Sequence, residues 1–364
     1  MKIAHVVDSM EMGGAETLVS QMCMLQRQQG QDPSVYAVAA LGALGERLLK
    51  EGFSVQPNVG THLVDSTRNF SRIFKKLRPD VVHFHNPTPT IYGAPAARLA
   101  GVPSIISTRH SLVAPPLNRA AELKYAIAAR FCDWIVGICD ATTTNLRATH
   151  LLPNRDIVRI YNGTVAPTRT RVDQCPPKSG FTLVYVGRLA PVKDHFSLLN
   201  GFHGALQSMP HLRLWMVGDG SERQALEAEA ARLEISNEVT FWGQQLDVAP
   251  FFSAADAFIM SSKSEGLPMS LLQAFSLGIP AIVTDVGGMA EVVRFAKAGL
   301  TVPVSTPAEM TRAILRMASD DTERRQFSIN AQAAFESNFT LEIMANAYMK
   351  LYRDTPRARR LAKF

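Results

Sequence analysis

The segment from Asp256 to Pro280 has the sequence D-A-F-I-M-S-S-K-S-E-G-L-P-M-S-L-L-Q-A-F-S-L-G-I-P. Its apolar run Ala257–Met260 predicts a buried strand, and a polar loop follows it. Pro268 has the fixed φ that suits the first turn of a helix. Gly278 can adopt the left-handed conformation that ends the helix, and Pro280 prevents its continuation. The segment therefore predicts a strand, a loop and a helix of an α/β domain.

The loop between this strand and this helix contains a carboxylate, Glu265, followed by Gly266. The helix start at Leu267 and Met269 presents backbone N–H groups and a partial positive charge, which together can hold phosphate. The carboxylate accepts hydrogen bonds from sugar hydroxyls. One loop is therefore suited to contact both the sugar and the phosphates of a sugar nucleotide.

Apolar runs typical of strands alternate with helical segments along the rest of the chain. The predicted strands of the first half are Ile3–Val7, Val35–Ala40, Val81–Phe84, Ser104–Thr108, Trp134–Ile138 and Ile157–Tyr161. Those of the second half are Phe181–Val186, Leu212–Val217, Val239–Trp242, Ala257–Met260 and Ala281–Thr284. This alternation predicts parallel sheets covered by helices on both faces, with ligands at the carboxyl ends of the strands.

A segment rich in proline separates the two halves, with Pro167, Pro176 and Pro177 in a stretch of low apolar content. We expect a doubly wound, Rossmann-like domain over residues 1–166 and a linker over 167–180. A second such domain, which binds the nucleotide sugar, is expected over 181–340, with a cleft between the two domains. A closing helix over about 341–364 is expected to pack back on the first domain.

The composition is that of a globular chain. Of 364 residues, 46% are hydrophobic, which is enough for two cores. No apolar run approaches the roughly 20 residues of a membrane-spanning helix, and the N-terminal residues read as a strand and not as a signal peptide. The four cysteines have neither metal-ligand spacing nor the density of a disulfide framework. We therefore expect a cytoplasmic protein.

The charge is distributed unevenly. Residues 1–170 carry 18 Lys and Arg against 12 Asp and Glu, whereas residues 171–364 carry 20 of each. The net charge of +6 therefore lies in the first half, where a predicted helix contains Arg68, Arg72, Lys75, Lys76 and Arg78. This pattern suits association with the anionic inner face of a membrane or a solvated helix face. Nucleic acid is not expected, because no binding motif accompanies the charge.

A second loop places two cations before a helix. The loop from Gly187 to Asp194 contains Arg188 and Lys193, and Asp194 suits the N-cap of the helix that follows. The helix dipole disfavours cations at this end, so the arrangement suggests a bound anion such as a diphosphate. The alternative is that both side chains extend into solvent.

Further loops at predicted strand ends carry glycine or histidine. Gly13 and Gly14 follow the first strand, and Gly218 and Gly220 precede a helix that a Ser221–Gln224 capping box is expected to begin. The glycines also suit simple tight turns. The histidines at strand ends are His83, His85 (followed by Asn86) and His110.

These motifs, in this order, resemble those of the retaining glycosyltransferases of family 4, which have the GT-B fold. Glu265 matches the first glutamate of the family's E-x7-E signature, whereas the second position holds Gln273. Gly187, Arg188 and Lys193 match the G-R-L-x3-K motif. The segments with Gly218 and Gly220, with Gly13 and Gly14, and with His110 are similar to the family's V-G-D-G, glycine-loop and T-x-H segments.

The resemblance implies transfer of a hexose from a UDP- or GDP-sugar to an acceptor hydroxyl with retained configuration. The acceptor would be a lipid-linked or growing glycan of bacterial surface polysaccharide. Arg188 and Lys193 would hold the diphosphate without a metal or other cofactor, and Glu265 and His110 would contact the transferred sugar. Gln273 would face the ribose, and His85 and Asn86 the acceptor.

Two other functional classes stay open. The chain would be a catalytically weakened nucleotide-sugar-binding protein if Gln273 marks a loss of activity. A related two-domain epimerase would share the architecture.

Overall fold

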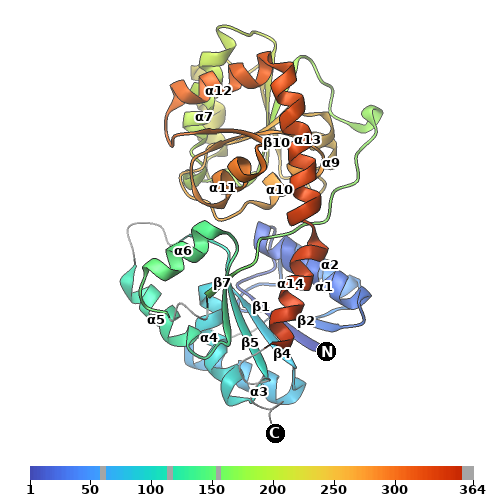
Figure 1. Ribbon diagram of the computed structural model, residues 1–364, viewed down its shortest axis with the longest axis vertical. Helices are drawn as coiled ribbons and strands as arrows, with labels where there is room; N and C mark the ends of the chain where they lie inside the picture. Colours follow the sequence, from blue (N-terminus) through green and yellow to red (C-terminus); the bar gives the residue numbers. More distant parts are fainter. Residues whose placement is uncertain (58–62, 113–117, 153–156, 355–364) are drawn as a thin grey trace. The chain divides into compact units, whose positions relative to one another are not determined.

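The computed structural model describes residues 1–57, 63–112, 118–152 and 157–354. The chain forms two compact units (Figure 1). Unit 1 is Met1–Thr164 together with the chain from Leu341, and unit 2 is Val165–Thr340.

Unit 1 is built on a parallel sheet of seven strands in the order β3-β2-β1-β4-β5-β6-β7. The strands are β1 (Lys2–Val7), β2 (Asp32–Ala37), β3 (Ser54–Pro57), β4 (Val81–His85), β5 (Ser104–Arg109), β6 (Trp134–Gly137) and β7 (Ile157–Arg159). The central strands β4 and β5 are buried along their whole length. Such continuous burial is expected where helices cover both faces of a parallel sheet.

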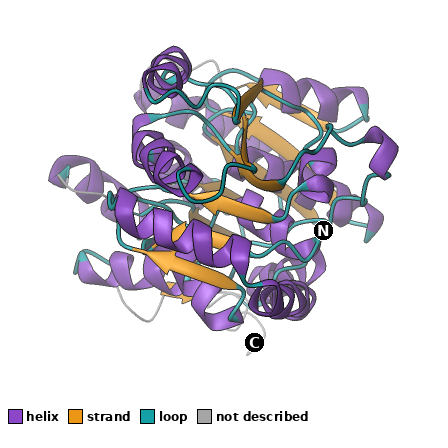
Figure 2. Cartoon of the chain, turned by 90° about the horizontal axis from the view of Figure 1, so that it is seen from above, coloured by secondary structure: helices purple, strands orange, loops and turns teal. Residues whose placement is uncertain are grey.

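Helices lie on either side of the strands (Figure 2), and one group of them belongs to unit 1. The helices of unit 1 are α1 (Gly14–Gln28), α2 (Gly42–Lys50), α3 (Leu63–Leu77), α4 (Pro87–Leu99), α5 (Arg119–Ala129), α6 (Asp140–Ala148) and α14 (Leu341–Arg353). The helix α14 returns to unit 1 from the end of the chain and buries Tyr348 and Tyr352 in it. The backbone N–H of Leu341 donates to Thr164 O at 3.1 Å, and Trp134 Nε1–H donates to Asp354 O at 3.2 Å.

Unit 2 repeats the plan with six parallel strands in the order β10-β9-β8-β11-β12-β13. The strands are β8 (Phe181–Val186), β9 (Leu212–Val217), β10 (Val239–Gly243), β11 (Ala257–Met260), β12 (Ala281–Thr284) and β13 (Gly299–Val302). Its helices are η2 (Val172–Gln174), η3 (Pro191–Lys193), α7 (His195–Leu206), α8 (Arg223–Arg232), α9 (Ala249–Ala254), α10 (Met269–Ser276), α11 (Gly287–Ala296), α12 (Pro307–Ser319) and α13 (Asp321–Asn338). The predicted pair of doubly wound parallel sheets is confirmed.

The strand order of each sheet reverses at one place. In unit 1 the reversal lies between β1 and β4, and in unit 2 between β8 and β11. The loops that leave the carboxyl ends of such neighbouring strands diverge to opposite faces and leave a crevice that ligands use. The loops after β1, β4, β8 and β11 are therefore the expected positions of a ligand site.

Several local predictions need correction. The edge strands β3 and β13 and the helices α2 and α4 are absent from the prediction. Pro268 is the extended N-cap of α10, with ψ of 132°, and is not inside its first turn. Helix α8 begins at Arg223 with no side-chain cap, so the Ser221–Gln224 capping box is wrong. The closing helix ends at Arg353, and residues 355–364 lie outside the described residues.

Candidate active site

In unit 2 the reversal point brings the loop after β8 beside the loop after β11. The ammonium group of Lys193 contacts the carboxylate of Glu265, which also accepts from Ser262 Oγ at 3.1 Å. The backbone holds the two loops together, because Lys263 N–H donates to Val192 O at 2.8 Å. Ser261 Oγ donates to Lys193 O at 2.8 Å. Two of the residues predicted for the site, Lys193 and Glu265, therefore form one ion pair.

The third charged residue of this group, Arg188, is exposed. Its carbonyl accepts a hydrogen bond from Tyr185 Oη at 2.9 Å, which fixes the backbone of the loop. Within the described part of the chain its guanidinium group pairs with no carboxylate. Since the charges of Lys193 and Glu265 offset each other, Arg188 leaves the group with one net positive charge and a free fork of donors for an anion.

Gly187 and Leu189 of this loop pack directly on the glycines of the loop after β9. Leu189 N–H donates to Asp219 O at 2.9 Å, and Gly187 N–H donates to Val217 O at 3.0 Å. A Cβ atom on Gly218, whose φ is +141°, would lie 1.9 Å from Gly187 O. A Cβ atom on Gly220 would lie 2.2 Å from Leu189 O. Glycine is thus required by close backbone approach, and the contact sets the position of Arg188.

The loop after β11 leads into α10. Gly266 O accepts from Gly288 N–H of α11 at 2.7 Å, so the starts of α10 and α11 are joined. Leu267 is buried before the helix and Met269 is its first residue. Gln273 follows one turn later and is half-buried. Its carbonyl accepts from Ser276 Oγ at 2.7 Å, and its amide group has no partner among the described residues.

In unit 1 the carboxyl ends of β4 and β5 bring His85, Asn86 and His110 together. His85 Nδ1 lies 3.1 Å from His110 Nε2. Asn86 has a left-handed backbone with φ of 77°, and its Oδ1 accepts from the backbone N–H of His110 at 3.1 Å. Asn86 N–H in turn donates to Thr108 O at 2.7 Å. Asn86 therefore fixes the backbone from which His110 projects.

Asp8, directly after β1, is a further candidate for the site that the sequence analysis does not predict. Burial raises the pKa of its carboxyl group, and hydrogen bonds with Thr88 and Asn86 partly offset the effect. A carboxylate directly after a buried first strand, at the point where the sheet reverses, is the signal that identifies it.

A bidentate ion pair supports His110 from the other side. Arg109 Nη1 and Nη2 donate to the Glu122 carboxylate at 2.9 and 2.8 Å, and both side chains are buried. Because Glu122 belongs to the first turn of α5, the pair joins the end of β5 to that helix. Breaking one partner of such a pair leaves a buried charge uncompensated.

Gly13 and Gly14 follow β1 as predicted, but Gly13 is the N-cap of α1 and Gly14 its first residue, and a side chain occupies the space beside them. A Cβ atom on Gly13 would lie 2.3 Å from Oε2 of Glu16. The carboxylate of Glu16 therefore lies at the N-terminus of α1. A phosphate bound at these glycines would have to displace it.

Three buried histidines, His5, His83 and His85, have ring nitrogens within 4.8 Å of one another. A metal would need bare nitrogens at about 2.0–2.1 Å. Every ring nitrogen of the three already has a hydrogen-bond partner at 2.7–3.1 Å. The cluster is therefore a hydrogen-bond network, and a metal would have to break it.

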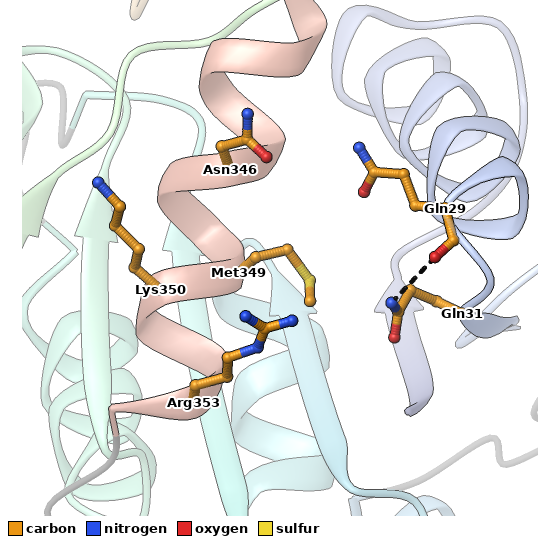
Figure 3. Close-up of a pocket in the computed structure, with 6 residues that line it drawn as sticks. All are labelled: Gln29, Gln31, Asn346, Met349, Lys350 and Arg353. Carbon is orange, nitrogen blue, oxygen red and sulfur yellow. Dashed lines mark hydrogen bonds between the residues drawn. The ribbon is translucent and has the colours of Figure 1, made fainter.

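Figure 3 shows a pocket of unit 1 that lies away from these loops. Gln29 and Gln31 at the end of α1 line one side of it, and residues of α14 line the other (Asn346, Met349, Lys350 and Arg353). Gln31 Nε2 donates to Gln29 O at 3.3 Å. None of the residues predicted for the site lines this pocket.

Comparison with known proteins agrees with the fold and the motifs. The family model for glycosyltransferase family 4 matches residues 12–165, and that for group 1 glycosyl transferases matches residues 168–334. The chain is 29% identical to the lipopolysaccharide core biosynthesis glycosyltransferase LpsE of Rhizobium meliloti over 60% of its own length. It is 25% identical to the phosphatidyl-myo-inositol mannosyltransferase of Mycobacterium leprae over 93% of its length and 92% of that protein. The matched segments span 64% of LpsE and 57% of LpsD, a second Rhizobium meliloti relative.

Solved structures show the same architecture. The Anabaena protein HepE, crystallised in complex with UDP, superposes with a TM-score of 0.83 at 19% identity, over 96% of this chain and 99% of that one. The fold and the motifs together define the GT-B class of glycosyltransferases. The chain belongs to glycosyltransferase family 4.

Proposed function

We propose that the protein is a retaining glycosyltransferase that moves a hexose from a UDP- or GDP-sugar to an acceptor hydroxyl. The observation that carries the proposal is the ion pair of Lys193 and Glu265 at the reversal point of the unit 2 sheet, with Arg188 on the same loop as Lys193. The UDP complex of HepE and the names of the lipopolysaccharide relatives support a nucleotide-sugar donor and an acceptor in bacterial surface polysaccharide synthesis.

In this proposal the cations act on the leaving diphosphate. Arg188 and Lys193 neutralise negative charge that grows on the diphosphate as its bond to the sugar breaks, and the N–H groups at the start of α10 add to them. A leaving-group oxygen takes the proton of the acceptor hydroxyl, and the new glycosidic bond forms on the face that the diphosphate leaves. Two cations and a helix N-terminus supply the positive charge, so we propose that no metal is needed.

Glu265 has a second role in this proposal. Its carboxylate accepts hydrogen bonds from hydroxyls of the transferred sugar and at the same time holds Lys193 in place. Ser262, which donates to the same carboxylate, fixes its orientation. Loss of the carboxylate would therefore disturb both the sugar and the cation.

The acceptor side supports a membrane-linked substrate. Four cations of α3 (Arg68, Arg72, Lys75 and Lys76) and Arg78 directly after it are all exposed, and none pairs with a carboxylate in the described residues. At the start of the same helix Leu63 and Val64 expose 44% and 58% of their surface. Exposed cations with neighbouring apolar side chains suit an anionic lipid surface. The described residues contain no helix long and apolar enough to span a bilayer.

The test is a thermal-shift screen of UDP- and GDP-sugars followed by a transfer assay. A ligand that binds only the folded protein raises its melting temperature by mass action. A stabilising nucleotide sugar that is slowly hydrolysed in the absence of an acceptor supports the transferase. Binding without hydrolysis or transfer favours a binding protein, and isomerisation of the sugar while it stays on the nucleotide favours an epimerase.

A further inference from the structure

One face of the unit 1 sheet carries four histidines that form a continuous network. His5 pairs with His83 in the register of β1 and β4, and His85 pairs with Thr108, two residues before His110. His5, His83 and His85 are at most 1% exposed. Four histidines on one buried face are unusual enough to need an explanation, because each buried polar group requires a partner.

The network has a linear branch that ends at His110. Gln26 Oε1 lies 2.9 Å from His5 Nε2, and His5 Nδ1 lies 3.1 Å from His85 Nε2. His85 Nδ1 lies 3.1 Å from His110 Nε2. Nδ1 of His110 is buried and has no hydrogen-bond partner among the described residues.

All members of this branch are neutral. Burial lowers the pKa of His5 and His110 to about 4 and that of His85 well below its ordinary value. No carboxylate bonds to their ring nitrogens in the described structure. Each imidazole therefore carries one proton, with one donor nitrogen and one acceptor nitrogen.

The amide of Gln26 then fixes every proton along the branch. A carbonyl oxygen can only accept, so His5 must carry its proton on Nε2 and leave Nδ1 bare. Bare Nδ1 of His5 requires the proton of His85 on Nε2, and bare Nδ1 of His85 requires the proton of His110 on Nε2. The unpartnered Nδ1 of His110 is therefore an acceptor.

The amide itself is oriented by α14. A side-chain hydrogen bond joins Gln26 to Tyr352. Since Oε1 of Gln26 lies 2.9 Å from His5 Nε2, the amide N–H group is the one that faces Tyr352. Tyr352 Oη lies 2.8 Å from His83 Nδ1, and His83 Nε2 lies 2.7 Å from Thr108 Oγ1. With its N–H group on Tyr352, the amide of Gln26 directs its oxygen to His5. If the amide were flipped, the proton of each histidine in the branch would move to the other ring nitrogen. The three tautomers therefore change together.

We propose that Gln26, His5 and His85 are positioning residues that hold His110 as its Nε2–H tautomer and present Nδ1 to a hydroxyl of the transferred sugar. The inference rests on the proposed function and on the role that the family resemblance implies for His110, which is contact with that sugar. A bare nitrogen selects a group that can donate a hydrogen bond, which a sugar hydroxyl does. Specificity at the sugar would thus be set about three side chains away, at the amide of Gln26.

The tautomers can be read directly by long-range ¹H–¹⁵N spectra of the full chain labelled with ¹⁵N-histidine, with His110 assigned by the His110→Asn variant. We expect His5, His85 and His110 all in the Nε2–H form. His110 in the Nδ1–H form would overturn the proposal, and this reading needs no variant of the network.

Variants of Gln26 test the cause. Gln26→Leu removes the acceptor, and we expect His110 to become a mixture of tautomers. Gln26→Glu keeps an oxygen that accepts from His5, and we expect the wild-type tautomer to be restored. Gln29→Leu changes the exposed C-cap glutamine of α1 and should leave all tautomers unchanged. A pure Nε2–H form in folded Gln26→Leu would overturn the role of Gln26.

Calorimetry with UDP and UDP-glucose tests the proposed contact between His110 and the sugar. Loss of one neutral hydrogen bond predicts that Gln26→Leu binds UDP-glucose about five-fold more weakly while UDP binds unchanged. Equal weakening of both ligands, or of neither, would overturn the sugar contact. If wild type binds no nucleotide sugar at all, the proposed function fails, whereas the tautomer assignment is still decided by the spectra.

Discussion

Lys193 and Glu265 are bonded to each other through their side chains, each less than one fifth exposed. The two residues come from loops that follow different strands, β8 and β11, and they meet because those strands are neighbours in the sheet. Neither acts as an isolated charge. A change at one alters the position and the electrostatics of the other, whereas Arg188 stands apart from the pair.

This difference separates the effects of two alanine variants. We expect Arg188→Ala and Lys193→Ala each to lower kcat/KM by about a hundred-fold or more, since each removes a charge that stabilises the leaving diphosphate. Only Lys193→Ala should also lower the free energy of unfolding, by about 1–3 kcal/mol, because it leaves the carboxylate of Glu265 unpaired. Steady-state kinetics and thermal melts on both variants check this. Arg325→Ala, an exposed cation of α13, should change neither quantity, and unchanged kcat/KM in both site variants would rule out the diphosphate assignment.

Gln273 and Glu265 should differ in the kinetic constant that they affect. A charged acceptor gains about 1 kcal/mol over a neutral one, so Gln273→Glu should lower the donor KM by a few-fold with little change in kcat. Glu265→Gln acts at the transferred sugar and frees Lys193, so it should mainly lower kcat. Steady-state kinetics with one donor decide between these effects. If Gln273→Glu creates activity where wild type has none, the protein is a decayed transferase.

A variant of Gly218 tests whether the loops after β8 and β9 must pack closely. Gly218→Ala would place a Cβ atom 1.9 Å from Gly187 O, so the loop that carries Arg188 must move. We expect lower kcat/KM and a loss of stability greater than that from backbone strain alone. Gly30→Ala is the matched control, because its φ of +76° is also left-handed but nothing lies within 4 Å of the added atom. Its cost should be about 1 kcal/mol, with activity unchanged. Equal effects of the two variants would contradict the close packing.

The histidine network should make unit 1 sensitive to acid. Burial lowers the pKa of His5 and His110 to about 4, against 6.5 for the ordinary group. The unfolded chain therefore binds protons between pH 6.5 and about 4 that the folded chain does not, and stability falls as the pH falls. Each such histidine contributes a slope of about 1.4 kcal/mol per pH unit.

Denaturant unfolding at pH 7.5, 6.0 and 5.0 measures this slope. His110→Gln should reduce the dependence of stability on pH by the contribution of one histidine. His211→Gln, which changes an exposed histidine, should leave that dependence unchanged. A slope that is the same in wild type and His110→Gln would show that His110 is charged in the folded protein.

Helix α3 should govern membrane association. Reversing Lys75 and Lys76 to glutamate removes two contributions of about 1 kcal/mol each, so binding to vesicles rich in anionic lipid should weaken by about thirty-fold or more. Flotation at low salt measures it. The control is the double reversal of Lys124 and Arg130, exposed cations at α5. Equal loss in both variants would indicate a non-specific charge effect, and no binding by wild type would indicate a soluble acceptor.

The sequence predicted the strands best where burial is continuous. Phe181–Val186, Leu212–Val217 and Ala257–Met260 agree with β8, β9 and β11 residue for residue, because each is an apolar run bounded by turn residues. The edge strand β3 buries only Val55, so no apolar run marks it. Helix α4 contains three prolines and a glycine, which conceal its helical pattern.

The site was predictable where motifs are local and not where contacts are distant in sequence. Arg188, Lys193 and Glu265 each belong to a short motif, and the structure brings Lys193 and Glu265 into contact. The meeting of His5 with His85 and of His83 with Tyr352 depends on strand order and on where α14 packs. No spacing within one segment contains that information.

The return of α14 to unit 1 has a consequence for the order of folding during synthesis. Unit 2 is one uninterrupted stretch, Val165–Thr340, and all of its residues leave the ribosome before α14 does. Unit 1 lacks Tyr348 and Tyr352 until unit 2 has been made, so the amide of Gln26 is without its Tyr352 partner in the nascent chain. The half of the protein that is translated first is therefore the half that is completed last.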